Sequence, residues 1–226
     1  MLKQEQNTEK YHSLIRDVPG GQLHDEHQLW QQFKNGDRSS FSRIYNTYIY
    51  SLYSYGDKIA RDKTLVEDCI HDLFVELWQQ KESLGGTSSI KFYLFKGLKR
   101  KIVKALQKEN KQSGHDSDAG TYAFSVDFSH ELHLVTQQLD EERKAHLARA
   151  LQKLSKREKE VIYLRFYDGL SYQEIASLMA ISVKTAYNSV HNAICHLRRS
   201  MVSKLNILPT LFGLLLTASI CYYFIS

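Results

Sequence analysis

Hydrophobic side chains recur at helical spacing along most of this chain. A first stripe lies at 29–33, and wider stripes follow at 41–53, 65–78 and 94–106. Residues three and four positions apart share one face of an α-helix, whereas strict alternation marks a half-buried strand. Few segments alternate in this way, so the pattern predicts an almost wholly helical protein.

Helix starts are marked twice in the C-terminal half by a serine with a glutamate three residues later. The pairs are Ser155 with Glu158 and Ser171 with Glu174. Each fits the capping box, in which the two side chains satisfy backbone N–H groups that have no partner at a helix start. Between them Gly169 can take the positive φ that ends a helix. The segment 154–199 is therefore predicted to form a helix-turn-helix.

The last helix of this segment is predicted to begin at Ser182 and to have two different faces. Ala186, Val190 and Leu197 fall at helical spacing on its apolar side. The second helix of a helix-turn-helix lies in the major groove of DNA, where cations and amides contact base edges. Alternatively, the polar face is simply solvated and the module binds nothing. The agreement between the helix caps and the helical spacing argues against this alternative. The residues expected to face duplex DNA are Ser182, Lys184, Thr185, Tyr187, Asn188, His191 and Arg198.

An acidic stripe is predicted on the helix at 64–78, for which Thr64 is the expected N-cap. Asp68, Asp72 and Glu76 recur every four residues and so lie on one face. Like charges at this spacing repel one another, and a basic partner surface would offset this repulsion by pairing with them. The alternative is a solvated acidic face, which the spacing alone slightly favours.

Beyond a polar loop at 83–89 the charge reverses, and aromatic residues are interleaved with basic ones. Cations that follow a phosphate backbone, with rings on which bases stack, suit the binding of single-stranded nucleic acid. A basic amphipathic helix with its rings in the core is the alternative. The candidate residues, called the basic aromatic segment below, are Phe92, Tyr93, Lys96, Lys99, Arg100, Lys101 and Lys104.

The predicted fold is all-α, with two small helical domains joined by a flexible linker, the second being the helix-turn-helix. The expected boundaries are a loose leader at 1–22, a first domain at 23–110, a linker at 111–134, a second domain at 135–203 and a hydrophobic tail at 204–226. Residues 205–226 carry no charge and have about the length that crosses a bilayer. A membrane anchor and a tail that packs on a protein partner both remain open.

Composition excludes several classes of protein. Cys69, Cys195 and Cys221 are far apart without a CxxC spacing, so neither a disulfide framework nor a zinc site is predicted. Ten histidines form no HExxH motif, and the chain contains no catalytic or nucleotide-binding signature. No enzyme activity, metal or cofactor is therefore expected. The net charge of +5 favours a polyanionic partner only weakly.

The order of these parts resembles the bacterial RNA polymerase sigma factors of the sigma-70 family, in their short extracytoplasmic-function (ECF) form with regions 2 and 4. DCIHDLFVELW at 68–78 is similar to the region 2 helix that docks on the polymerase core. IKFYLFKGLKRKIVKAL at 90–106 is similar to the segment that melts and holds the −10 element, and the loop at 83–89 to the part that captures a flipped base. The segment 154–199 is similar to region 4, which reads the −35 element.

The resemblance implies a cytoplasmic protein that binds RNA polymerase core, promoter DNA and an anti-sigma factor. It assigns core binding to Asp68, Asp72 and Glu76, the −10 strand to the basic aromatic segment and the −35 duplex to the residues at 182–198. Base preferences do not carry over at Lys99-Arg100 and Ser189, where the family often has other residues. A helix-turn-helix regulator that acts without polymerase, and a sigma-like interaction protein held at the inner membrane by 205–226, remain as alternatives.

Overall fold

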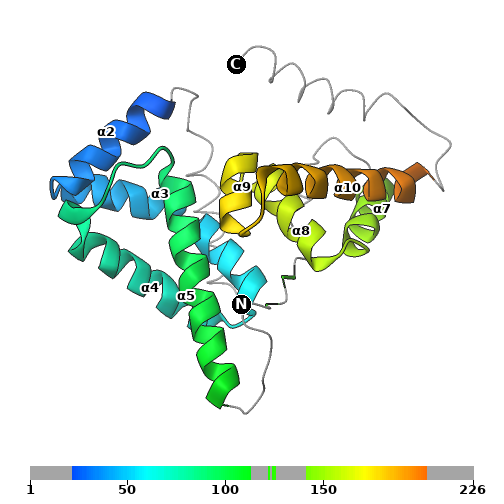
Figure 1. The fold of residues 1–226 in the computed structure, drawn as a ribbon, viewed down its shortest axis with the longest axis horizontal. Coiled ribbons are helices and arrows are strands. Elements are labelled where there is room, and N and C mark those ends of the chain that lie inside the picture. The colour runs from blue at the N-terminus through cyan, green and yellow to red at the C-terminus, as the bar shows by residue number, and fades with distance from the viewer. Residues whose placement is uncertain (1–21, 113–121, 123, 126–140, 203–226) are drawn as a thin grey trace. The chain divides into compact units, whose positions relative to one another are not determined.

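The computed structural model describes residues 22–112, 122, 124–125 and 141–202 (Figure 1). The chain divides into two compact units, the first comprising Met1–Gly56 and Asp62–Lys108 and the second Asp57–Arg61 and Glu109–Ser226. Within the described ranges every regular element is helical, which confirms the predicted all-α class.

Within the described residues, the first unit comprises four α-helices and one short 3-10 turn. The predicted stripes at 29–33, 41–53, 65–78 and 94–106 all fall within these helices. The elements are α2 (Gln22–Lys34), α3 (Arg38–Ala60), α4 (Lys63–Gln79), η1 (Lys81–Ser83) and α5 (Ile90–Gln112).

Aromatic side chains fill the core of the first unit. Trp30 and Phe33 of α2 are fully buried, and the ring of Tyr55 on α3 stacks on that of Phe95 on α5 at 5.0 Å between centroids. The apolar stripe of α3 therefore continues past Tyr53, where the sequence pattern was expected to end. Phe95 is likewise fully buried in this core.

Polar caps fix where the helices of the first unit begin. Asp37 accepts a hydrogen bond from the backbone N–H of Ser40 at 2.8 Å at the start of α3. The N-cap of α4, however, is Asp62, whose Oδ1 accepts from the Leu65 N–H at 3.0 Å. The prediction of Thr64 was wrong because α4 begins at Lys63, and a residue inside the first turn already has helical backbone angles.

The second unit contains the predicted helix-turn-helix. Its elements are α7 (Glu141–Gln152), α8 (Lys156–Ile162), the π-helical turn η2 (Tyr163–Tyr167), α9 (Tyr172–Leu178) and α10 (Val183–Val202). Helix α10 packs on α7, α8 and α9. Both predicted capping boxes are present, and Gly169 has a φ of +70° after the π-helical turn. Phe166 lies on that turn, and its ring is 57% exposed.

Part of the predicted linker at 111–134 packs on the second unit. The hydroxyl of Tyr122 donates to the buried carboxylate of Glu160 at 2.6 Å, and Phe124 is buried with its ring 5.9 Å from that of Tyr163. Helix α5 also extends to Gln112, beyond the expected domain end. The predicted leader at 1–22 lies almost wholly outside the described residues, and the tail at 204–226 does so entirely. Within the described ranges, no helix combines the length and apolar character needed to cross a bilayer.

Two helical glycines allow α3, α4 and α5 to approach closely, and they provide a matched pair of stability tests. A Cβ at Gly56 would lie 2.7 Å from Val66 Cγ1 and 3.1 Å from Ile102 Cδ1, and the branched Val66 is fully buried. Gly56→Ala is therefore expected to lower the free energy of unfolding by about 1–3 kcal/mol in urea denaturation. Gly97→Ala meets a single side-chain atom, the terminal Cδ1 of Leu73 at 2.7 Å, and should cost less. Equal or greater stability of Gly56→Ala than of the natural protein would contradict this account.

Candidate functional site

Side-chain hydroxyl and carboxylate groups cap the N-terminal ends of α9 and α10, the two helices that present the candidate DNA-binding surface. At the start of α9 the Ser171 N–H donates to Glu174 Oε2 at 2.8 Å, and the Glu174 N–H donates to Ser171 Oγ at 3.3 Å. At the start of α10 the Thr185 N–H donates to Ser182 Oγ at 3.0 Å. The turn between them contains Ala180 with a φ of +53°. Ser182 thus caps α10, and its hydroxyl is already hydrogen-bonded within the protein.

All the residues predicted to face duplex DNA are exposed on α10 or at its cap. Lys184, Asn188 and His191 lie at positions i, i+4 and i+7, so they share one stripe opposite the buried Ala186, Val190, Ala193 and Leu197. This stripe, with Tyr187 beside it, is called the reading face below. The sequence interpretation missed Asn192, which is exposed one turn after Asn188. Its i+4 spacing from Asn188 was the available signal.

Aromatic rings occupy the side of the reading face next to α9. The Tyr187 ring lies 5.4 Å from that of Tyr172 and 6.4 Å from that of His191, centroid to centroid. The Arg165 guanidinium lies 4.8 Å from the centroid of Tyr172 and donates to the Leu170 carbonyl at 3.0 Å. The position of Tyr187 is therefore supported from beneath by α9 and by the π-helical turn.

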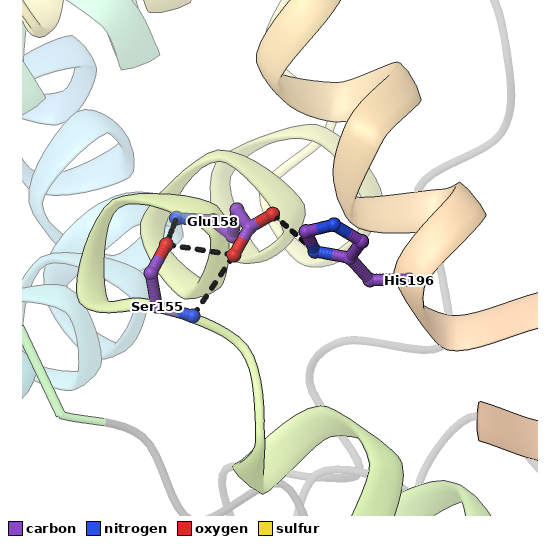
Figure 2. Close-up of polar contacts among 3 residues, drawn as sticks. All are labelled: Ser155, Glu158 and His196. Atoms are coloured by element: carbon purple, nitrogen blue, oxygen red, sulfur yellow. Dashed lines mark hydrogen bonds and ion pairs between the residues drawn. The ribbon is translucent and has the colours of Figure 1, made fainter. Parts of the chain in front are cut away.

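A single carboxylate connects the start of α8 to α10. Glu158 Oε2 accepts from the N–H of Ser155 at 2.9 Å and from its hydroxyl at 2.7 Å, while Oε1 lies 2.7 Å from His196 Nδ1 (Figure 2). Partial burial opposes ionisation of Glu158, but the hydrogen bonds from Ser155 and the neighbouring imidazole of His196 outweigh it and lower its pKa. The contact helps to fix α10 relative to α8, and the sequence interpretation did not foresee it.

The acidic stripe predicted on α4 is exposed along its length, but its members differ in their surroundings. Asp68 and Asp72 point to solvent, whereas Glu76 forms an ion pair with Lys101 of α5, with 2.5 Å between Oε1 and Nζ. The hydrogen bond from Lys101 lowers the pKa of Glu76. A residue assigned by sequence to a protein partner and one assigned to DNA are therefore bound to each other.

An apolar groove of about 820 Å³ lies between α3 and α4, next to the acidic stripe. Two of its lining side chains, Tyr45 and Val75, are among the most exposed large hydrophobic residues of the described ranges, at 40% and 38%. The sequence interpretation had placed Tyr45 on the apolar face of its helix without foreseeing a groove. The remaining lining residues are Phe41, Ile49, Tyr50, Tyr53, Glu67, Ile70, His71, Phe74, Trp78 and Gln79.

The basic aromatic segment lies on α5 and is partly engaged in the core. Lys96, Arg100 and Lys104 are exposed at successive i+4 positions and form one basic stripe. Phe92 and Tyr93 are half-buried, and the Tyr93 ring packs 5.2 Å from Trp30. Burial raises the pKa of the Tyr93 hydroxyl. Lys99 and Lys101 are also half-buried, so the structure brings only part of the predicted set onto one exposed face.

The loop that precedes α5 is held by a buried side chain. Trp30 Nε1 donates to the carbonyl of Gly85 at 2.9 Å, and Ser89 Oγ accepts from the Phe92 N–H at 3.1 Å. In the described part of the chain, no group of three or more histidine, cysteine or acidic side chains is placed to hold a metal ion.

Comparisons with known proteins agree with this arrangement. The family described as "Sigma-70, region 4" matches residues 144–197, which include α8, α9 and most of α10. The chain is 23% identical to the ECF RNA polymerase sigma factor SigK of Mycobacterium ulcerans over 184 residues, which are 81% of this chain and 97% of that protein. It is 24% identical to the ECF RNA polymerase sigma factor SigX of Bacillus subtilis, covering 72% of this chain and 84% of that protein.

A solved structure shows the same fold. The structure of CnrH in complex with the cytosolic domain of CnrY matches with a TM-score of 0.50 and 19% identity, covering 79% of this chain and 98% of the solved chain.

The Glu158 contact predicts a specific dependence of stability on pH. Because the pKa of Glu158 is lowered from 4.5 in the folded protein, its contribution is complete above that value and is lost as pH falls through the lower folded pKa. Glu158→Gln should keep a capping side chain but lose the contact of the carboxylate with His196. We expect a deficit in unfolding free energy of up to about 1 kcal/mol at neutral pH that shrinks towards pH 3.

The control is Glu82→Gln, because the Glu82 side chain is 87% exposed. The unfolding free energies of the natural protein and of Glu158→Gln are measured by urea denaturation across pH 3–7. A difference in unfolding free energy that stayed constant over this range would contradict the assignment.

Proposed function

Since the chain belongs to the sigma-70 family and is a sigma factor of the ECF type that acts in transcription initiation, we propose that its two helical units divide promoter recognition between them. The first unit docks on RNA polymerase core and holds the melted −10 strand, and the second reads the −35 duplex. The observation that carries this proposal is the exposure, on one helix of a helix-turn-helix, of every residue that the sequence assigned to duplex DNA.

Core docking is assigned to the outer face of α4. Asp68 and Asp72 provide a negative surface beside the apolar groove between α3 and α4. A partner helix with apolar residues for the groove and basic residues for the stripe would be complementary to both features. Glu76 is already paired with Lys101, so we assign it to holding α4 against α5 and leave docking to the two aspartates.

The −10 strand is assigned to the exposed side of α5. Lys96, Arg100 and Lys104 form a basic stripe that can follow a phosphate backbone. Phe92 and Tyr93 retain part of their ring surface for stacking, which contributes about 1–3 kcal/mol per base. This gain offsets the few kcal/mol that unstacking a base costs. The loop held by Trp30 adjoins these rings and supplies backbone groups for an extruded base.

The −35 duplex is assigned to the reading face of α10. Asn188 and Asn192 present amides, which pair with adenine in the major groove, and Lys184 presents a cation for guanine or phosphate. Arg198 lies farther along the helix and suits a phosphate. A regulator that acts without polymerase is less well supported, because it gives no role to the groove and aspartates of the first unit. The family also implies an anti-sigma factor, and we include one among the proposed binding partners of this chain.

Run-off transcription tests the proposed function. Purified polymerase core from the source bacterium, with and without this chain, is supplied with a pool of its promoter fragments. The expected result is a set of transcripts that appear only with the chain and begin downstream of shared −35 and −10 sequences. If a folded chain gave none, while the same core responded to another sigma factor, the proposed function would be wrong.

Charge reversal on α4 tests the docking surface separately. Asp72→Lys should weaken binding to polymerase core at least about tenfold, because it places a cation opposite a basic partner surface. Affinity is measured by titrating fluorescently labelled chain with core. The matched control is Glu82→Lys, which reverses an exposed acid outside the stripe and should bind normally. Equal weakening by both variants would indicate a general effect of net charge instead of docking through Asp72.

A further inference from the structure

The start of α10 exposes apolar surface where a DNA-binding helix usually presents polar groups. Val183 and Tyr187 are 45% and 54% exposed, and their i, i+4 spacing places them side by side on the helix. They adjoin Lys184 and Asn188 of the reading face. The two adjacent side chains provide apolar surface that an apolar group of a bound partner can cover.

The Tyr187 ring is held in place before any DNA arrives. Tyr172 packs against it from α9 at 5.4 Å with a tilt of 59°, and His191 lies one turn farther along α10 with its ring nearly parallel, at 8°. Arg165 in turn fixes Tyr172 by its position over the ring and its hydrogen bond to Leu170. A ring supported from two sides loses little conformational entropy on binding.

The major groove offers one apolar group to such a surface. Hydrogen-bond donors and acceptors line the base edges, and the exception is the 5-methyl group of thymine, which is recognised by apolar contact. The N-terminal part of a recognition helix is the part that meets base edges, and Val183 and Tyr187 lie there. Their position, exposure and chemistry therefore agree with a single feature of the duplex.

We propose that Val183 and Tyr187 form an apolar contact for the 5-methyl group of one thymine in the −35 duplex, with Tyr172 as the positioning residue for Tyr187. The inference rests on the proposed function, since it specifies which chemical feature the reading face recognises. A Tyr187 hydroxyl bound to a phosphate is the competing role, and it would make the residue indifferent to base sequence.

The test removes only the methyl group from the DNA. Holoenzyme assembled from core and the full chain first selects preferred duplexes from a pool randomised across the −35 element. Each thymine of the selected sequence is then replaced by uracil, which keeps every hydrogen-bonding group, and the affinity of the holoenzyme is measured for each duplex. One position should lose about fourfold in affinity, as expected for one methyl group that is no longer buried.

Variants assign that loss to named side chains. In Tyr187→Ala and Val183→Ala holoenzymes the thymine-to-uracil ratio at that position should fall towards one, and Tyr172→Ala should reduce it partly. Tyr187→Phe should keep the ratio, because it removes only the hydroxyl. The matched control is Phe166→Ala, which removes an exposed ring of the same unit outside α10 and should also keep the ratio.

The outcomes separate the inference from the proposed function. The holoenzyme could select a defined −35 sequence in which no thymine position is sensitive to uracil. Alternatively, the sensitivity could persist in both Val183→Ala and Tyr187→Ala. Either result would overturn the methyl contact and leave the proposed function standing. Loss of affinity in Tyr187→Phe on all duplexes alike would assign the hydroxyl to a phosphate and also overturn it. Failure of the pool to yield any −35 preference would remove the proposed function and the inference together.

Discussion

The burial of one narrow face of α10 is the constraint on which the second unit depends. Ala186 and Ala193 are fully buried, so the backbone of α10 can approach its neighbours closely, and Val190 and Leu197 complete the contact with them. Because these positions fix the rotation of α10 about its own axis, they also decide which side chains remain outside. The polar residues thus set the chemistry of the reading face. The buried alanines set the direction in which that face points, although they lie on the opposite side of the helix.

In the first unit, the same charges are available to the protein itself and to its partners. The acidic face of α4 and the basic face of α5 meet at Glu76 and Lys101, where the two patterns neutralise each other. Asp68 and Asp72 on one helix, and Lys96, Arg100 and Lys104 on the other, are exposed, and the charges of Arg100 and Lys104 also act on Glu76. The internal ion pair therefore lies where the negative surface of α4 meets the positive surface of α5.

Local signals made much of this structure predictable, and contacts between distant residues account for most of the rest. The capping boxes at Ser155 and Ser171 depend on residues three apart, and sequence alone identifies them. The pairing of Glu158 with His196 depends on how α10 packs on α8, which no local pattern specifies. Two phenylalanines of the second unit also escape local patterns. Phe166 is exposed on the π-helical turn, and Phe124, within the predicted linker, is buried with its ring 5.9 Å from that of Tyr163. The assignment of individual side chains to DNA or polymerase stays a prediction.

The shared use of the Glu158 carboxylate has a consequence for how the second unit opens. Opening the first turn of α8 would release Ser155 and would also deprive His196 on α10 of its partner. Local fraying at one helix end is therefore coupled to the helix that carries the reading face, and the two segments are expected to behave as one cooperative foldon in native-state hydrogen exchange. Such coupling would keep α10 folded and correctly oriented until the unit opens. When it opens, the start of α8 and α10 would unfold together.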